Sequence, residues 1–167
     1  MTIRKLTVLA LYTTLSLAIY AVESAIPPLV PIPGIKLGLA NIISLILLRN
    51  HSLRDSMLVV IARILLSTLL FGQFMSLLYS FAGGIASLLV MAAVNRLLHK
   101  GYLYLTGAVG GLTHNLGQLS VAFLLTATPG VLAYLPFLVI SGILTGFFTG
   151  FCAYFGEKFL LPHIKKL

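Results

Sequence analysis

Long apolar runs, separated by short polar or turn-forming stretches, dominate the hydropathy pattern of the chain. The runs are continuous over about 15 to 25 residues, the length that a helix needs to cross a bilayer, and they lack the period-two alternation of a half-buried strand. Each run is therefore predicted to be a membrane helix. Six such segments can be drawn, at residues 6–24, 35–49, 56–72, 74–98, 102–127 and 131–157.

The composition predicts an all-α integral membrane protein with one domain, residues 1–167. Hydrophobic residues make up 59% of the chain and charged residues 8%, and the mean hydropathy is +1.09. A water-soluble domain of this length would need far more charged surface. The first run follows Arg4 and Lys5 but reaches Val22 without a small-residue cleavage site, so we expect a retained helix and not a signal peptide.

The basic residues predict the orientation of this six-helix bundle. An even number of spans places both termini on the same side of the membrane. Nine of the eleven Lys and Arg residues then fall on that side, which the positive-inside rule assigns to the cytoplasm. We therefore interpret the net charge of +8 as a signal of topology and not as a nucleic-acid surface.

A proline-rich stretch, residues 27–36, precedes the second apolar run. Each proline fixes its own φ and lacks an N–H, so residues 27–33 cannot lie inside a helix, whereas Gly34 lets the chain turn into the next one. That helix offers about 15 residues, or about 22 Å, which is short for a hydrocarbon core of about 30 Å. The loop must then dip into the membrane, either as a lid over a site or as a packed turn with a snorkelling Lys36.

Arg63 lies in the middle of the third apolar run. An arginine near the bilayer midplane costs at least about 2.5 kcal/mol on insertion scales and needs partners inside the bundle. Glu23 is expected about 10 Å higher along the membrane normal, so the sequence does not predict a complete ion pair. Two interpretations stay open: backbone carbonyls or the amides of Asn41 and Asn115 satisfy Arg63, or an anionic ligand does.

The fifth run contains the densest polar cluster. His114 and Gln118 share a helix face, and the glycines of residues 107–111 lie close to His114 on that face, which predicts room for a bound molecule. A pocket here, open to the outside, would favour an acidic or phosphorylated small molecule; alternatively, His114 is a satisfied core residue. Other side chains expected at this depth are Lys36, Asn41, Glu23 and Asn115.

Small residues recur every four positions in the first and last runs. Such strips allow a neighbouring helix to approach closely. For the first run the neighbour is either another helix of the chain or a second protein, and for the last run we expect a helix of the same chain. The strips are Ala10, Thr14 and Ala18 in the first run, and Gly142, Gly146 and Gly150 in the last.

The sequence lacks the residue sets of common enzymes. Glu23, Asp55 and Glu157 are spread over both predicted membrane faces, whereas Mg²⁺-assisted diphosphate chemistry needs clustered carboxylates. The glycine pairs lack the lysine of a phosphate-binding loop, and the single cysteine, Cys152, excludes a cysteine-based metal site. We therefore expect no catalysis, no cofactor and no metal.

Four motifs occur in order along nearly the whole chain: PGIKLGLAN at 33–41, ARILLS at 62–67, SFAGG at 80–84 and GAVGGLTHNLGQ at 107–118. Together they resemble the Gx transporter family, whose members are often labelled heptaprenyl diphosphate synthase component I. This family is similar to the substrate-binding S components of energy-coupling-factor transporters. Those are six-helix membrane proteins that capture vitamins or related precursors from outside, with a transmembrane coupling subunit and a pair of ATPases as partners.

The resemblance implies a role for each conspicuous segment. The loop from Pro27 to Lys36, with Pro31, Pro33 and Gly34, would be the lid, and the strip Ala10, Thr14 and Ala18 would dock on the coupling subunit. The substrate would be a small, anionic vitamin, quinone or isoprenoid precursor. The implied substrate-binding residues are Asn41, Arg63, His114, Asn115 and Gln118. Lys36, which is expected at the same depth, is a further candidate.

The synthase label gives an alternative interpretation. The aspartate-rich motifs of prenyl diphosphate synthases are absent from the sequence, so the chain would be a non-catalytic membrane accessory of polyprenyl diphosphate or menaquinone synthesis. The two hypotheses differ in partner: a coupling subunit with ATPases, or a soluble synthase. Both predict a multi-pass protein of a prokaryotic plasma membrane with cytoplasmic termini.

Overall fold

The computed structural model of the chain describes residues 2–26, 36–71, 74–98 and 102–164, with side chains up to Phe159. These residues form six α-helices and one 3₁₀-helix, and no strand occurs among them. The predicted all-α class is therefore confirmed. The elements are α1 (Ile3–Ser24), α2 (Asn41–Asn50), α3 (Leu53–Phe71), α4 (Phe74–Leu97), α5 (Leu103–Thr126), η1 (Pro129–Tyr134) and α6 (Leu135–Ile164).

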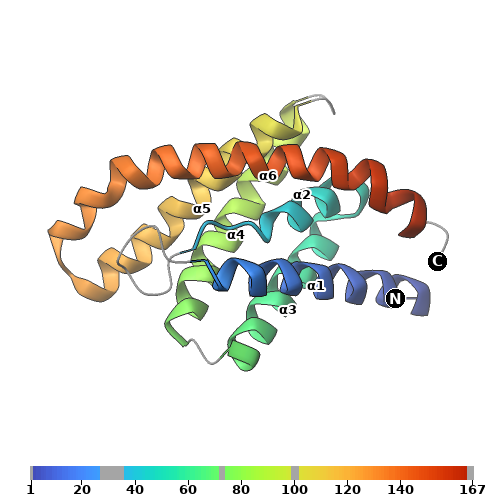
Figure 1. Cartoon of the computed structure of the whole chain (residues 1–167), viewed down its shortest axis with the longest axis horizontal. Coiled ribbons are helices and arrows are strands. Elements are labelled where there is room, and N and C mark those ends of the chain that lie inside the picture. The colour runs from blue at the N-terminus through green and yellow to red at the C-terminus, as the bar shows by residue number, and fades with distance from the viewer. Residues whose placement is uncertain (1, 27–35, 72–73, 99–101, 165–167) are drawn as a thin grey trace.

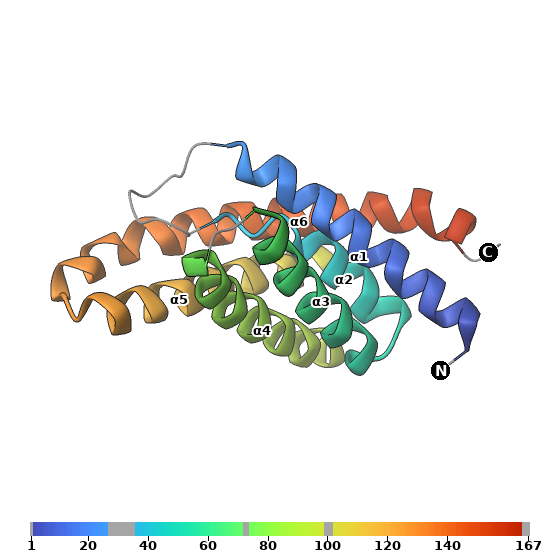
Figure 2. The same cartoon turned by 90° about the horizontal axis from the view of Figure 1, so that it is seen from below.

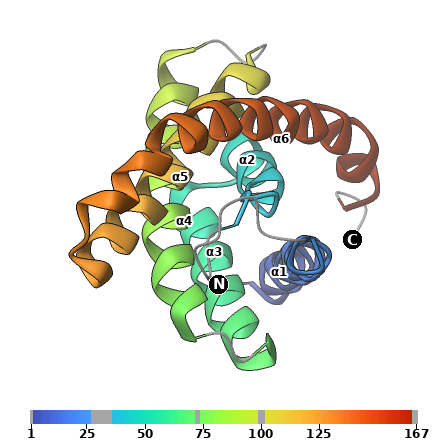
Figure 3. The same ribbon diagram turned by 60° about the vertical axis from the view of Figure 1, so that its left-hand side comes forward.

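The helices pack around the short α2. Helix α5 has its most extensive contacts with α6 and α4, while α1 packs mainly on α3 and lies at the edge of the bundle (Figures 1 and 3). Six of the ten residues of α2 are buried, so this helix belongs to the core. Helix α1 begins and α6 ends at the same end of the molecule (Figures 1 and 2), an arrangement that fits an even number of crossings.

Three of the described elements are long and apolar enough to cross a membrane: α1, α4 and the η1–α6 unit over Pro129–Phe159. Their outer faces carry large exposed hydrophobic side chains, as a lipid-facing surface would. Helix α3 carries a charged residue in its middle, and α2 rises only about 15 Å over its ten residues. The chain thus has the character of a membrane protein, and the count of six spans stays a prediction.

The second helix starts later than predicted. It begins at Asn41 and not at residue 35, because Gly38 adopts a φ of 81°, in the left-handed region that ends a helix and that glycine enters without strain. Residues 36–40, which we call the strap, therefore run as a non-helical segment into α2. The predicted lid residues Pro31, Pro33 and Gly34 lie outside the described residues.

The last helix is also displaced from its predicted limits of 131–157. Pro129 begins the 3₁₀-helix η1, and α6 runs from Leu135 to Ile164. Ala127, with a φ of 47°, ends α5 in the left-handed conformation and turns the chain toward η1. The apolar run thus contains a turn that its hydropathy does not reveal.

Glycines bring α5 and α6 into backbone contact. A Cβ at Gly111 would overlap the carbonyl oxygen of Gly142, and a Cβ at Gly107 would overlap that of Gly146. The glycine strip of α6 therefore packs on a helix of the same chain, as predicted.

The third glycine of this stretch faces α4 instead. A Cβ at Gly110 would lie 2.5 Å from Cγ and Sδ of Met91. The expectation that residues 107–111 leave room for a ligand beside His114 is therefore wrong, because α6 backbone and Met91 occupy the space.

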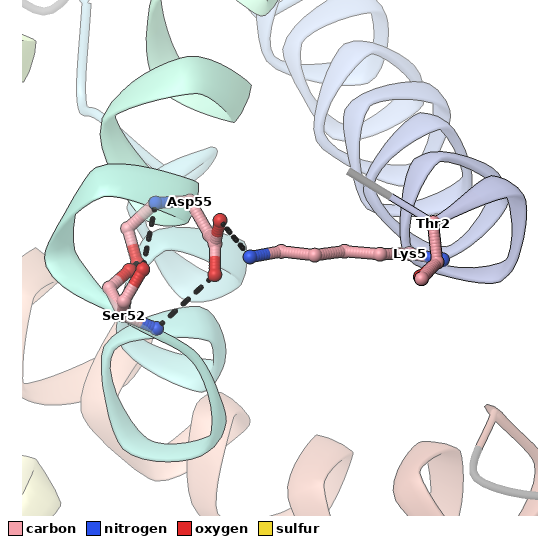
Figure 4. A network of polar contacts seen from close by, with 5 residues as sticks. Thr2, Lys5, Ser52 and Asp55 are labelled. Atoms are coloured by element: carbon pink, nitrogen blue, oxygen red, sulfur yellow. Dashed lines mark hydrogen bonds and ion pairs between the residues drawn. The ribbon is translucent and has the colours of Figure 1, made fainter.

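The end of the molecule where α1 begins is held by capping and ion pairs. Ser52 and Asp55 form a reciprocal N-cap of α3: the Ser52 hydroxyl accepts from the Asp55 N–H at 3.2 Å, and an Asp55 oxygen accepts from the Ser52 N–H at 3.4 Å (Figure 4). Lys5 Nζ lies 2.7 Å from the other Asp55 oxygen and joins α1 to α3. Arg49 pairs with Glu157 at 3.2 Å, which joins α2 to α6.

Candidate functional site

The strap is anchored by Glu23, near the end of α1. The two carboxylate oxygens accept hydrogen bonds from the backbone N–H groups of Gly38 at 2.7 Å and Leu39 at 3.0 Å. Glu23 is 4% exposed, so the carboxylate is buried with its hydrogen bonds directed at main chain. Hydrogen bonds that involve a charged acceptor are about twice as strong as neutral ones, and this pair fixes the strap on α1.

Lys36, at the start of the strap, makes contacts through both its side chain and its backbone N–H. Its ammonium donates to Ser24 Oγ at 2.6 Å and lies 3.7 Å from the centroid of the Tyr20 ring. Its backbone N–H donates to Gln118 Oε1 of α5 at 3.3 Å. The positive charge is therefore held against α1, by a hydroxyl and by the face of an aromatic ring.

His114 and Gln118 contact each other, as their spacing on α5 predicted. Gln118 is fully buried, and its Nε2 lies 3.1 Å from His114 Nε2. Because Gln118 Oε1 already accepts from Lys36, we assign Nε2 as the donor, which makes His114 Nε2 an acceptor and the ring neutral. His114 Nδ1 then carries the proton and faces Gly83 of α4, where an added Cβ would lie 3.0 Å away.

Arg63, on α3, is the least satisfied polar side chain of the site. It is 3% exposed, and its Nε and Nη2 atoms have no hydrogen-bond partner among the described residues. Glu23 and Tyr20 are near enough to act on it electrostatically. Nη2 lies against Gly84 of α4, since a Cβ there would be 3.3 Å from it. A buried guanidinium with free donors is costly and is ready to bind an acceptor.

The two asparagines point in different directions. Asn41 Nδ2 donates to Ser87 Oγ at 3.3 Å, and Ser87 in turn donates to the Gly110 carbonyl at 2.8 Å, so Asn41 faces the site. Asn115 Nδ2 donates to the Leu138 carbonyl at 2.8 Å and faces α6. The structure therefore brings together Lys36, Asn41, Arg63, His114 and Gln118, with Asn115 on the other side of α5.

Several residues of this network were not identified from the sequence. Ser87 connects Asn41 to α5, and the Tyr20 hydroxyl lies 2.9 Å from Ser76 Oγ. A signal was available on α4, where small buried residues recur at helical spacing and mark the face turned toward the site. They are Ser76, Ser80, Gly83, Gly84 and Ser87.

All three acidic side chains of the chain are bound within the protein, at separate places. Glu23 binds the strap, Asp55 binds Lys5 and Ser52, and Glu157 binds Arg49 and Asn50. Among the described residues, no group of three or more His, Cys, Asp or Glu side chains is placed to hold a metal ion.

The strip of small residues on α1 faces away from the rest of the described structure. Ala10, Thr14 and Ala18 are exposed, while Tyr12, Ser16 and Tyr20 on the opposite face are buried. The Thr14 hydroxyl donates to the Ala10 carbonyl at 3.0 Å within the helix, so its hydrogen bond is satisfied inside α1. No other described helix of the chain covers this strip.

Comparison with known proteins identifies a family but no characterised relative. Neither a curated protein nor a solved structure matches the chain. One family model does match, over residues 12–155, which include the whole candidate site. The chain therefore belongs to the family described as heptaprenyl diphosphate synthase component I.

Proposed function

We propose that the chain is a membrane substrate-binding subunit, similar to the S components of energy-coupling-factor importers, for a small anionic vitamin, quinone or isoprenoid precursor. The observation that carries the proposal is the buried Arg63 guanidinium, whose Nε and Nη2 lack partners among the described residues. A buried charged group costs free energy in an apolar bundle. A group that is kept despite this cost is expected to bind a solute.

The surroundings of Arg63 support this role. The strap covers the site with main-chain contacts to α1 and α5, through Glu23 and Gln118. The polar atoms of Asn41 and His114 lie beside the strap, since a Cβ at Gly38 would be 3.2 Å from Asn41 Nδ2 and 3.0 Å from His114 Nε2. We propose Lys36, Asn41, Arg63 and His114 as ligand contacts and Gln118 as the residue that orients His114.

The exposed strip on α1 supports a partner. We propose that Ala10, Thr14 and Ala18 dock a transmembrane coupling subunit, because small side chains let a second helix approach the backbone of α1. In this proposal all six α-helices are membrane-embedded in a prokaryotic plasma membrane, with cytoplasmic termini, and a pair of ATPases supplies the energy.

Purification of a tagged chain under gentle solubilisation tests the proposal. We expect an ATPase pair and a membrane coupling subunit to co-purify, as identified by mass spectrometry. The double variant A10L/A18L should lose them, because two larger side chains fill the contact. The control variant A93L, with the same change at an exposed position of α4, should keep them. Recovery without these subunits, or equal recovery with A10L/A18L, would reject the importer.

A second candidate function rests on the family description. The chain could be a membrane accessory of polyprenyl diphosphate synthesis, because the family is described as a component of heptaprenyl diphosphate synthase. Its own three carboxylates are engaged elsewhere, which favours a non-catalytic role. Co-purification of a soluble synthase, without ATPases, would favour this candidate.

A further inference from the structure

We propose that the ligand carries a monoanionic carboxylate, which Arg63 binds through two parallel N–H groups. This inference rests on the proposed function and names the chemical class of its substrate. It follows from which atoms of the guanidinium are unpaired, from what the neighbouring groups already bind, and from the balance of charge around the site.

The two unpaired atoms belong to one edge of the guanidinium. In arginine, the Nε–H bond and one N–H bond of Nη2 point in the same direction, so that edge presents two parallel donors. A carboxylate offers two oxygens at the matching spacing and accepts both bonds at once. In Arg63, Nε and Nη2 are the two atoms without a hydrogen-bond partner among the described residues.

The polar side chains of the site make hydrogen bonds to groups other than Arg63. Both oxygens of Glu23 accept N–H groups of the strap. His114 Nε2 is bonded to Gln118, and Asn41 donates to Ser87. None of the described residues accepts a hydrogen bond from Nε or Nη2 of Arg63, so we assign this acceptor to the ligand.

The charge balance favours one negative charge on the ligand. Arg63 and Lys36 contribute two positive charges and Glu23 one negative charge, which leaves a net charge of +1 among these three groups. A carboxylate neutralises this excess. A phosphate monoester carries about −1.5 to −2 at pH 7 and would leave unbalanced negative charge in a buried site.

The buried edge of Arg63 packs against a glycine of α4. Gly84 lies beside Nη2, and a Cβ there would be 3.3 Å from this atom and 3.4 Å from Ile64 Cδ1. The 3.3 Å approach to Nη2 is tighter than ordinary van der Waals contact, so an alanine requires the guanidinium to shift by a few tenths of an ångström. We therefore assign Gly84 as a positioning residue for the carboxylate contact.

The test observes the Arg63 Nε–H directly. The full chain, labelled with ¹⁵N-arginine and reconstituted in lipid nanodiscs, is titrated with formate, the smallest carboxylate. The chain has five arginines, so R63K assigns the Arg63 signal by its loss. If R63K does not fold, substituting the other four arginines one at a time assigns it by elimination. R49K is the matched control, because the Arg49 guanidinium is already paired with Glu157 of α6.

We expect formate to shift the Arg63 Nε–H signal downfield in a saturable manner, in the wild type and in R49K alike. Formamide and chloride, which lack the anionic pair of oxygens, should not shift it, and G84A should weaken the response to formate severalfold. Absence of a formate shift would overturn the inference. An equal shift with chloride, or a stronger one with inorganic phosphate, would overturn it as well.

The outcome separates this inference from the proposed function. A formate response in a chain that purifies without ATPases would leave the carboxylate site standing and reject the importer. Co-purified ATPases with no formate response would do the opposite.

Discussion

Adding one methyl group at Gly38 tests whether the strap fits closely over the site. Gly38 has a φ of 81°, donates its N–H to Glu23 and accepts from the Asn41 N–H at 2.9 Å. A Cβ at this position would lie 2.8 Å from His114 Cδ2 and 3.0 Å from His114 Nε2. Gly38→Ala therefore meets two separate obstacles, one in its own backbone and one in α5.

The free-energy cost of each obstacle can be estimated separately. A non-glycine residue in the left-handed region costs about 1–2 kcal/mol. Forcing a methyl group into a filled site costs about 1–3 kcal/mol, and His114 cannot move freely because Gln118 holds its ring. The sum predicts that G38A loses about 2–5 kcal/mol of unfolding free energy. For a chain of this size, each kcal/mol lowers the melting temperature by about 2–4 °C.

Thermal unfolding of the purified protein in detergent measures the loss. Gly130→Ala is the matched control, because its Cβ would meet only Thr128 Cγ2 at 3.6 Å, and we expect a change of less than about 0.5 kcal/mol. A double-mutant cycle then separates the two obstacles. In an H114A background the contact with His114 disappears and only the 3.2 Å approach to Asn41 Nδ2 remains, so G38A should cost little more than the backbone share of about 1–2 kcal/mol.

Two results would refute this reasoning. If G38A costs the same in the wild type and in H114A, the strap does not touch His114. If G38A unfolds at the same temperature as the wild type and G130A, the strap is not held in the left-handed turn at all.

Further predictions concern the helix contacts and the loop before α3. Gly111→Ala should lower stability by about 1–3 kcal/mol in the same assay, because backbone of Gly142 cannot yield as a side chain would. Glu23→Gln should cost about 1–3 kcal/mol, because the amide cannot accept both strap N–H groups; an unchanged melting temperature would contradict the anchor. Burial lowers the pKa of His51 below its ordinary value, so the unfolded chain takes up the proton first, and stability present above about pH 6.5 should fall as the pH drops. His51→Phe, which keeps the ring contact with Tyr12, should remove this pH dependence; an equal loss in both proteins would reject it.

Hydropathy and local chemistry predicted much of the fold. The limits of α4 and α5 lie within one residue of the predicted runs, and the glycine strip of α6 packs on a helix of the same chain as predicted. These features depend on residues close in sequence or on one helix face. The strap does not, because the non-helical turn at Gly38 is stabilised by Glu23, a residue on another element.

The candidate site also has features that local sequence predicts and features that depend on tertiary packing. The His114–Gln118 contact follows from helical spacing alone. The glycines of residues 107–111 share that face, but their use depends on which helix packs against them, and α6 and Met91 take the space that the spacing had suggested for a ligand. The outward direction of the strip on α1 also depends on tertiary packing, and no periodicity could distinguish it from an inward one.

The charges at the centre of the bundle indicate which residue carries the function. Burying a charge in an apolar bundle is costly, so each buried charge needs partners. Glu23 has the strap, and Lys36 has Ser24 and the Tyr20 ring. If the role of Arg63 were structural, its Nε and Nη2 should be satisfied in the same way. They have no partner among the described residues, while Glu23, the nearby carboxylate, binds main chain instead. The Nε and Nη2 donors of Arg63 are thus left without an acceptor in the described part of the chain, and we attribute this to an acceptor that arrives with a ligand.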